Sequence, residues 1–323
     1  MIDPERLRRR LSEVWTALGD EVMRACALTL VAVVDPAAGP EEAARTLAEL
    51  MPEHPSRAVI IRLEDGPPDL LDADVEAQCW MPFGQRRQIC SEQIVIRCSD
   101  QTFGEVPAVV LPLVVPDLPV VVWCASRRAW LSSAFPNLAA SAGRVIADSA
   151  AIPEAFGAAG VADLAWTRLT RWRALLAQVF DNEVYRRRIL EFSSLAIRHE
   201  GTRSPAALLF AGWLASCLAW DDDRLRAIRF ETTGDDGVGR LLGFDLAGGS
   251  ARVSVHRTGD ACGQVLLEAS GQKPVQNRVS LAPSTDRLLL EEELSIQAPD
   301  PVFDQSRRWA LRLAEIRHER SVV

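Results

Sequence analysis

Nucleophilic catalysis is the first chemistry that the side chains of this chain suggest. A cysteine or serine nucleophile needs a base within reach, and the candidates are His54, His199, His256 and His318. His54, Cys90 and Asp117 can be drawn as a triad, because each lies near the end of an expected strand. Cys90, however, falls inside a regular strand pattern and lacks the sharp turn or helix start that activates a thiol. We therefore expect no catalytic residues, with His54 forming part of a turn.

Motifs for cofactors and metals are equally weak. The glycine-rich residues 234–243, GDDGVGRLLG, join two expected strands, whereas a dinucleotide fingerprint opens a helix. The three aspartates at 221–223 lack the spacing of a calcium loop, and the cysteines and histidines lack zinc-ligand spacing. Lys273 is the single lysine of the chain, which argues against Schiff-base chemistry and a phosphate-loop lysine. We expect neither a cofactor nor a metal.

A carboxylate stands in an apolar stripe within ICSEQIVIRC, residues 89–98. Strand geometry puts Cys90, Glu92 and Ile94 on one face, so Glu92 faces an apolar environment. It should pair with an arginine, accept backbone hydrogen bonds or become protonated, because an isolated buried charge is costly. Arg57 is the expected partner. The alternative is a half-solvated Glu92 near the strand end, and in either case the residue organises the fold or a contact surface.

Two cysteines fall in one expected β-hairpin. Residues 70–80, LLDADVEAQCW, alternate strictly between apolar and polar side chains and should pair antiparallel with residues 88–98. Cys79 could then lie beside Cys90 and form a redox-sensitive pair. Seven cysteines in a chain without an export signal instead favour reduced thiols, so we prefer the interpretation as two buried apolar cysteines.

A second candidate site is the helix expected at residues 164–180. The helical period places Arg168 and Arg171 near one side, Arg173 extends this basic patch, and Trp172 lies on another side. Arginine and tryptophan dominate protein interface hot spots, so these four side chains are candidates for gripping a partner. Alternatively, the tryptophans pack between two domains and the arginines neutralise acidic neighbours.

Two architectures are expected to position these residues. In the first half, short β-branched runs alternate with helical segments, which predicts a mixed α/β sheet containing an antiparallel hairpin. Small residues, glycine and proline break the periodicity at 151–163 and suggest an N-terminal domain at 1–152 and a C-terminal domain at 153–323. The second domain should combine helices with an antiparallel β meander, giving α/β followed by α+β. The meander strands are expected at residues 224–233, 240–246, 251–257, 263–270 and 287–295.

Composition limits the possible functions. With 323 residues and 48% hydrophobic content, the chain can bury a large core. A net charge of −8 and a pI near 5.2 argue against nucleic-acid binding. The apolar residues 106–125 have the length of a membrane span, but they contain Asp117 and four prolines. The amino terminus lacks a secretory signal pattern, so we expect a cytoplasmic protein without nucleic-acid or membrane partners.

Four segments carry a family resemblance: HPSR at 54–57, CSEQIVI at 90–96, LPLVVPDLPVVVW at 111–123 and DLAWTRLTRWRALLAQVFD at 163–181. In sequence, order and spacing they resemble the OpcA family of glucose-6-phosphate dehydrogenase assembly proteins, over roughly residues 25–320. The resemblance implies a non-catalytic factor that binds glucose-6-phosphate dehydrogenase and favours its active oligomer. That enzyme is the NADP-linked entry point of the oxidative pentose phosphate pathway.

A second class of function stays open. The N-terminal α/β domain could bind a sugar phosphate or nucleotide, which would make the chain a metabolite-binding regulator or a thiol-dependent enzyme. Stabilisation by a metabolite in the absence of any protein partner would favour this alternative.

Overall fold

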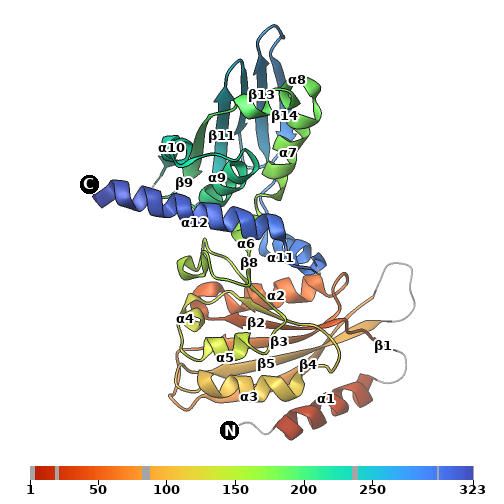
Figure 1. Cartoon of the computed structure of the whole chain (residues 1–323). Coiled ribbons are helices and arrows are strands. Elements are labelled where there is room, and N and C mark those ends of the chain that lie inside the picture. Colours follow the sequence, from red (N-terminus) through yellow and green to blue (C-terminus); the bar gives the residue numbers. More distant parts are fainter. Residues whose placement is uncertain (1–3, 19–21, 82–87, 235–238, 297, 323) are drawn as a thin grey trace. The chain divides into compact units, whose positions relative to one another are not determined.

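The computed structural model describes residues 4–18, 22–81, 88–234, 239–296 and 298–322 (Figure 1). The chain forms two compact units, and each is described by itself. Unit 1 comprises Met1–Asp163 and Asp286–Ser295, and unit 2 comprises Leu164–Thr285 and Ile296–Val323. The expected domains at 1–152 and 153–323 stay a prediction about which parts fold independently. Residues 235–238 of the glycine-rich segment lie outside the described residues.

Unit 1 is built on an eight-stranded sheet with the order β1-β5-β3-β2-β6-β7-β8, and β4 pairs with β5. The β4/β5 pair is antiparallel and all other neighbours are parallel, so the expected α/β sheet with its hairpin is confirmed. The central strand β2 is rich in β-branched residues and is buried along its whole length, as in a sheet covered on both faces. The strands are β1 (Met23–Arg24), β2 (Leu28–Val34), β3 (Ser56–Leu63), β4 (Leu71–Trp80), β5 (Ile89–Cys98), β6 (Val120–Cys124), β7 (Arg144–Ala147) and β8 (Val161–Asp163).

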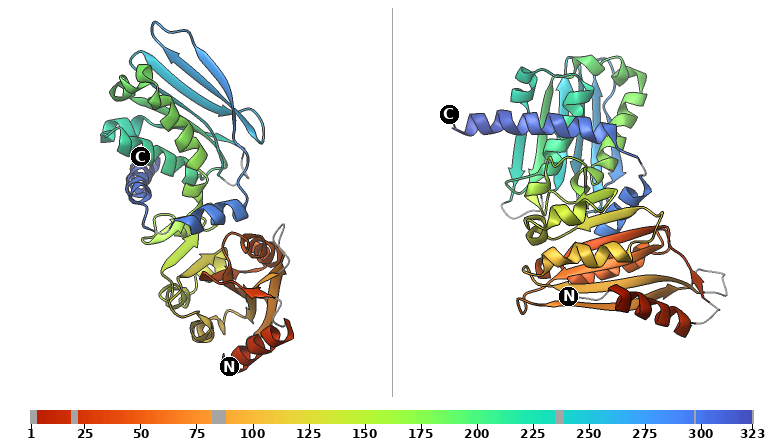
Figure 2. Two further views of the ribbon diagram at one scale, coloured as in Figure 1. Left: turned by 90° about the vertical axis from the view of Figure 1, so that its right-hand side faces the viewer. Right: turned by 60° about the horizontal axis from the view of Figure 1, so that its bottom comes forward.

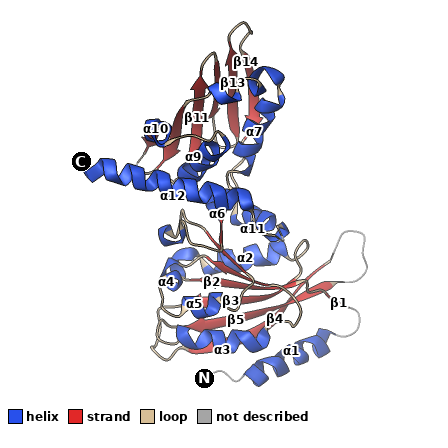
Figure 3. Cartoon of the chain, viewed as in Figure 1, coloured by secondary structure: helices blue, strands red, loops and turns tan. Residues whose placement is uncertain are grey.

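Helices cover the two faces of this sheet (Figure 3). One face forms a core with Leu7 and Leu11 of α1 and with Val109 of α3, whereas α2 packs against β2, β3 and α11. Residues 106–125 form α3, the 3₁₀ turn Leu111–Leu113 and β6. Among the described residues, no helix is long and apolar enough to cross a membrane. The helices are α1 (Pro4–Leu18), α2 (Pro40–Leu50), α3 (Val106–Val110), α4 (Arg127–Trp130), α5 (Phe135–Ala139) and α11 (Asp286–Ser295).

Unit 2 is built on a six-stranded mixed sheet with the order β10-β9-β11-β12-β13-β14. The pairs from β9 through β14 are antiparallel, as expected for a meander, but β10 runs parallel to β9. The strands are β9 (Ser194–Glu200), β10 (Arg229–Thr233), β11 (Leu241–Gly248), β12 (Ala251–Arg257), β13 (Cys262–Ala269) and β14 (Val275–Ser280). The helices are α6 (Leu164–Thr167), α7 (Thr170–Asp181), α8 (Glu183–Arg186), α9 (Pro205–Cys217), α10 (Asp222–Ala227) and α12 (Pro301–Val322).

Three expected elements of the second half are corrected. Residues 224–227 of the strand expected at 224–233 belong to helix α10, and strand β10 covers only residues 229–233. Residues 287–295, expected as a strand, belong to helix α11, because Leu289, Leu290 and Glu293 recur at helical spacing and are the buried side chains. This helix is grouped with unit 1. The single helix expected at 164–180 is two helices, α6 and α7, separated by Arg168 and Leu169.

Candidate functional site

Glu92 is the centre of a buried charge cluster at the amino-terminal edge of the unit 1 sheet. Only 4% of the residue is exposed. Its carboxylate accepts a hydrogen bond from Arg57 Nε of β3, forms an ion pair with Arg24 of β1, and accepts from Trp15 Nε1 of α1 at 2.7 Å. The expected Arg57–Glu92 pair is therefore confirmed, and the half-solvated alternative is wrong.

The cluster joins elements that are distant in sequence. Arg57 also donates to the carbonyl oxygen of Leu113, and the Arg24 guanidinium lies 5.1 Å from the ring centroid of Trp15. A carboxylate that accepts from three donors is compensated for its loss of water, so the residue stays inside the fold as a structural anchor.

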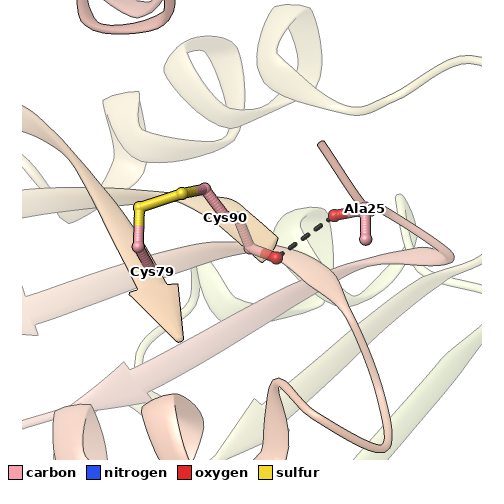
Figure 4. Close-up of a disulfide and its surroundings, with 4 residues drawn as sticks. Ala25, Cys79 and Cys90 are labelled. Atoms are coloured by element: carbon pink, nitrogen blue, oxygen red, sulfur yellow. Dashed lines mark hydrogen bonds between the residues drawn. A yellow bond between two sulfur atoms is a disulfide. The ribbon is translucent and has the colours of Figure 1, made fainter. Parts of the chain in front are cut away.

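Cys79 and Cys90 are joined by a disulfide across the β4/β5 pair (Figure 4). Their Cα atoms are 4.1 Å apart in directly opposed register positions. Cys90 is fully buried, whereas Cys79 is exposed. The preferred interpretation as two reduced thiols is wrong, because the strict alternation of both strands brings the two side chains together on one face. Whether redox conditions act on this bond stays a prediction.

The triad drawn from His54, Cys90 and Asp117 is not supported. The sulfur of Cys90 is bonded to Cys79 and is no free nucleophile. His54 lies in the turn after α2, where its backbone N–H donates to Leu50 O at 2.8 Å. Asp117 is exposed in the turn before β6, with a left-handed φ of 63°.

The carboxyl ends of β2 and β6 are where doubly wound sheets usually bind ligands, because the strand order reverses there. Asp35 follows β2 and Ser126 follows β6, and both are buried. The Ser126 hydroxyl donates to Asp35 and accepts from Ala129 N at 2.9 Å. Asp35 also accepts from the N–H groups of residues 37 and 38. Sequence reasoning missed this pair, although a serine three residues before Ala129 is a recognisable helix cap.

The aromatic residues of the second candidate site belong to the core of unit 2. Trp172 is 3% exposed, and its ring centroid lies 6.3 Å from that of Phe244. Its expected role as a partner contact is corrected, because a side chain packed against the sheet is not available to a partner. Trp166 is equally buried and donates from Nε1 to Asp300 at 3.0 Å.

The arginines of this segment have different surroundings. Arg171 is exposed on α7, and Arg168 is half-buried between α6 and α7. The Arg173 guanidinium stacks 3.6 Å from the ring centroid of Trp166, and its Nη2 donates to Thr170 Oγ1 at 3.0 Å. Only part of the expected basic patch therefore faces solvent, with Arg171 as its exposed member.

A polar cluster on the unit 2 sheet escaped sequence reasoning. Asp245 of β11 accepts from Ser254 Oγ at 2.5 Å, and its other oxygen lies 3.1 Å from His256 Nε2. Arg198 Nη1 lies 3.5 Å from the other ring nitrogen of His256. Gly243 lies beneath this ring, since a Cβ there would be 2.2 Å from His256 Nδ1. The alternation of apolar and polar side chains in ARVSVHR, residues 251–257, indicated a strand with Ser254 and His256 on one face. It did not indicate that Asp245 of the neighbouring strand would lie beside them.

These features define a protein with one doubly wound α/β unit and one unit of helices on a mixed sheet, in which the carboxylates of Glu92, Asp35 and Asp245 have partners within the chain. The chain belongs to the OpcA family of glucose-6-phosphate dehydrogenase subunits. The family model described as "glucose-6-phosphate dehydrogenase subunit N-terminal domain" matches residues 47–162, and the corresponding C-terminal domain model matches residues 159–307. The family expected from the sequence is thereby confirmed.

Curated relatives carry the same family name. A protein of Synechococcus elongatus named OxPP cycle protein OpcA is 31% identical over 199 residues, which is 55% of this chain and 44% of the relative. The protein of that name from Synechocystis is 29% identical over 170 residues, covering 46% of this chain and 35% of the relative. The matched part of the chain spans less than half the length of these relatives.

Solved structures resemble the chain in fold alone. The transcriptional regulator Gal80p of Kluyveromyces lactis matches with a TM-score of 0.50 and 9% identity, over 95% of each chain. A levoglucosan dehydrogenase in complex with NADH and L-sorbose matches with a TM-score of 0.43 and 11% identity, over 90% of this chain and 96% of that one.

Proposed function

We propose that this protein is a non-catalytic assembly factor that binds glucose-6-phosphate dehydrogenase in the cytoplasm and favours its active oligomeric state. The proposal rests on one observation: both family models, named for a subunit of that enzyme, match in order over residues 47–307. The curated relatives are named for the oxidative pentose phosphate cycle, and glucose-6-phosphate dehydrogenase is the entry enzyme of that pathway.

The mechanism is a shift of population between states of the enzyme. A partner changes such an equilibrium only by binding one state more tightly than the other. A preference of about 1.4 kcal/mol changes the ratio of the two states tenfold. The chain therefore needs no reacting group of its own, and the internal pairing of Asp35 with Ser126 and of Cys79 with Cys90 is compatible with that role.

The test uses the full chain and the dehydrogenase encoded by the same organism. We expect light scattering to detect a complex, and enzyme kinetics to give a higher kcat or a lower KM for glucose 6-phosphate when the chain is added. The same chain after heat denaturation serves as the control. A folded chain that forms no complex and leaves both constants unchanged would overturn the proposal. If sugar phosphates then stabilised the chain alone against heat, the metabolite-binding alternative would replace it.

A further inference from the structure

The turn at residues 115–118 exposes a carboxylate just before β6. It belongs to the segment 111–119, which runs from α3 of unit 1 to β6 (Figure 2). The N–H of Leu118 donates to the carbonyl oxygen of Val115 at 3.4 Å and closes the turn. Asp117 is the third residue of the turn and has a left-handed φ of 63°. It is exposed and has no hydrogen bond or ion pair with any residue that the structure describes. The turn therefore holds a carboxylate in a costly backbone conformation without an internal partner.

The local sequence does not require this conformation. The tripeptide Pro-Asp-Leu occurs twice in the chain, at 116–118 and at 68–70. In the second turn the N–H of Leu70 donates to the carbonyl oxygen of Pro67 at 2.9 Å, so Asp69 is again the third residue. Asp69 is also exposed, but its φ is not left-handed. Since the same tripeptide in an equivalent turn adopts an ordinary backbone, the surroundings of Asp117 impose its conformation.

Thr29 clamps both sides of the turn at 115–118. Its hydroxyl oxygen accepts from the N–H of Val115 at 3.2 Å, and its own N–H donates to the carbonyl oxygen of Pro119 at 2.9 Å. Thr29 is fully buried near the start of β2, so the clamp is fixed to the centre of the unit 1 sheet. The rings of Pro116 and Pro119 restrict the backbone further. A segment held in this way is preorganised, which lowers the entropy lost when a partner binds it.

The exposed neighbours of Asp117 in this segment are apolar, which favours arginine as the group that it binds. Leu111 is 60% exposed, and Pro116 and Pro119 are exposed as well. A guanidinium binds a carboxylate through two parallel hydrogen bonds, and its flat face packs well against neighbouring side chains. The net charge of −8 on the chain also favours association with a positively charged surface.

We propose that the turn at 115–118 is a docking site for an arginine of glucose-6-phosphate dehydrogenase, with Asp117 as the charged contact. This inference rests on the proposed function, because it takes the dehydrogenase as the partner. It goes beyond that function by naming the contact on this chain. The left-handed backbone at Asp117 presents the carboxylate to the partner and does not serve the fold.

The first test measures the dissociation constant of the complex with the full chain. Asp117→Asn removes the charge but keeps a residue that tolerates a left-handed backbone. We expect its dissociation constant to rise about tenfold, and to depend less steeply on salt concentration, because one charge is missing from the interface. The matched control is Asp69→Asn in the equivalent turn, which should bind like the wild-type chain.

Asp117→Gly separates binding from stability. Glycine adopts a left-handed φ without strain, so the urea midpoint should stay equal or rise while the dissociation constant rises as in Asp117→Asn. Wild-type affinity in both Asp117 variants would overturn the docking site and leave the assembly function standing. A lower urea midpoint of Asp117→Gly would also overturn it, because Asp117 would then serve the fold. A folded wild-type chain that forms no complex would overturn both proposals.

Discussion

The Arg57 guanidinium and the Glu92 carboxylate form an ion pair between β3 and β5, with only 5% of the glutamate side chain exposed. The pair connects the sheet to the segment before β6, because Arg57 also donates to Leu113 O. Trp15 adds α1 to the same carboxylate. One buried charge thus holds three parts of unit 1 that are far apart in sequence.

Removing Arg57 should destabilise the chain strongly. Arg57→Ala leaves the Glu92 carboxylate buried with fewer donors, and we expect a loss of about 3–5 kcal/mol in the free energy of unfolding, measured in urea. The control is Arg97→Ala, which breaks an exposed pair with Asp72 and should cost about 0–1 kcal/mol. The double variant Arg57→Met, Glu92→Met should recover much of the loss. Equal stabilities of Arg57→Ala and Arg97→Ala would contradict a buried anchor.

Close packing of α9 on α12 depends on Gly212. A Cβ at this position would lie 2.5 Å from Ser306 O and 2.6 Å from Ala310 N, both backbone atoms that cannot rotate away. Gly212→Ala should therefore lower the free energy of unfolding by about 1–3 kcal/mol through overpacking. Gly259→Ala is the control, because nothing lies within 4 Å of its added Cβ. A Gly212→Ala variant as stable as this control would show that α12 moves aside without cost.

Thiol labelling should distinguish the disulfide from the free cysteines. Cys217 and Cys262 are exposed free thiols and should react with a maleimide in the native chain. Cys79 is equally exposed but should react only after treatment with a dithiol reductant, which transfers two electrons to the disulfide and leaves two protein thiols. Mass spectrometry of labelled peptides gives the answer. Labelling of Cys79 without reductant would contradict the pairing, and unchanged dehydrogenase activation after reduction would end its proposed role as a redox-sensitive pair.

Alkaline pH should weaken the fold through its buried thiols. Burial raises the pKa of Cys98 and of Cys124 from 9.0 to about 12. Their contribution to stability is fully present below pH 9 and is lost as the pH rises towards 12, because the unfolded chain releases these protons first. Urea unfolding at pH 8, 9.5 and 11 should give a falling free energy of unfolding. The variant Cys98→Ala, Cys124→Ala should have a shallower slope, and an equal slope would assign the loss to other groups.

Much of unit 1 could be predicted because the pattern of each segment agrees with the position that the segment takes in the sheet. The β-branched runs that became β2, β3 and β6 have no helical period, and strict alternation identified the β4/β5 hairpin. In the second half the signals conflict. Residues 287–295 are rich in leucine and glutamate over too short a length to separate a strand from a helix, and the exposed residues of β14 are too polar to indicate a strand.

The sequence predicted the candidate site only where a buried charge required a partner of opposite charge. A carboxylate in an apolar stripe requires a donor, which identified the Arg57–Glu92 pair. Nothing in the sequence links Trp15 or Arg24 to that carboxylate, since both lie on elements without a shared pattern. Trp172 could not be assigned from composition, because cores and interfaces use the same residue type.

Arg171 and Trp172 are adjacent in sequence, but their substitution should affect different properties. The Arg171 variant should affect partner binding, and the Trp172 variant should affect stability. Arg171 is exposed on α7, so Arg171→Glu should leave the unfolding curve unchanged and, if this helix contacts the dehydrogenase, weaken the complex. Trp172→Ala removes a ring packed against Phe244 and should cost about 3–5 kcal/mol of stability. The matched control for surface charge is Arg187→Glu, because Arg187 is also exposed and directly follows α8. Unfolding in urea and dehydrogenase activation are measured on all three variants. Equal activation by folded Arg171→Glu and Arg187→Glu would remove this helix from the interface, whereas a selective loss with Arg171→Glu would locate the partner there.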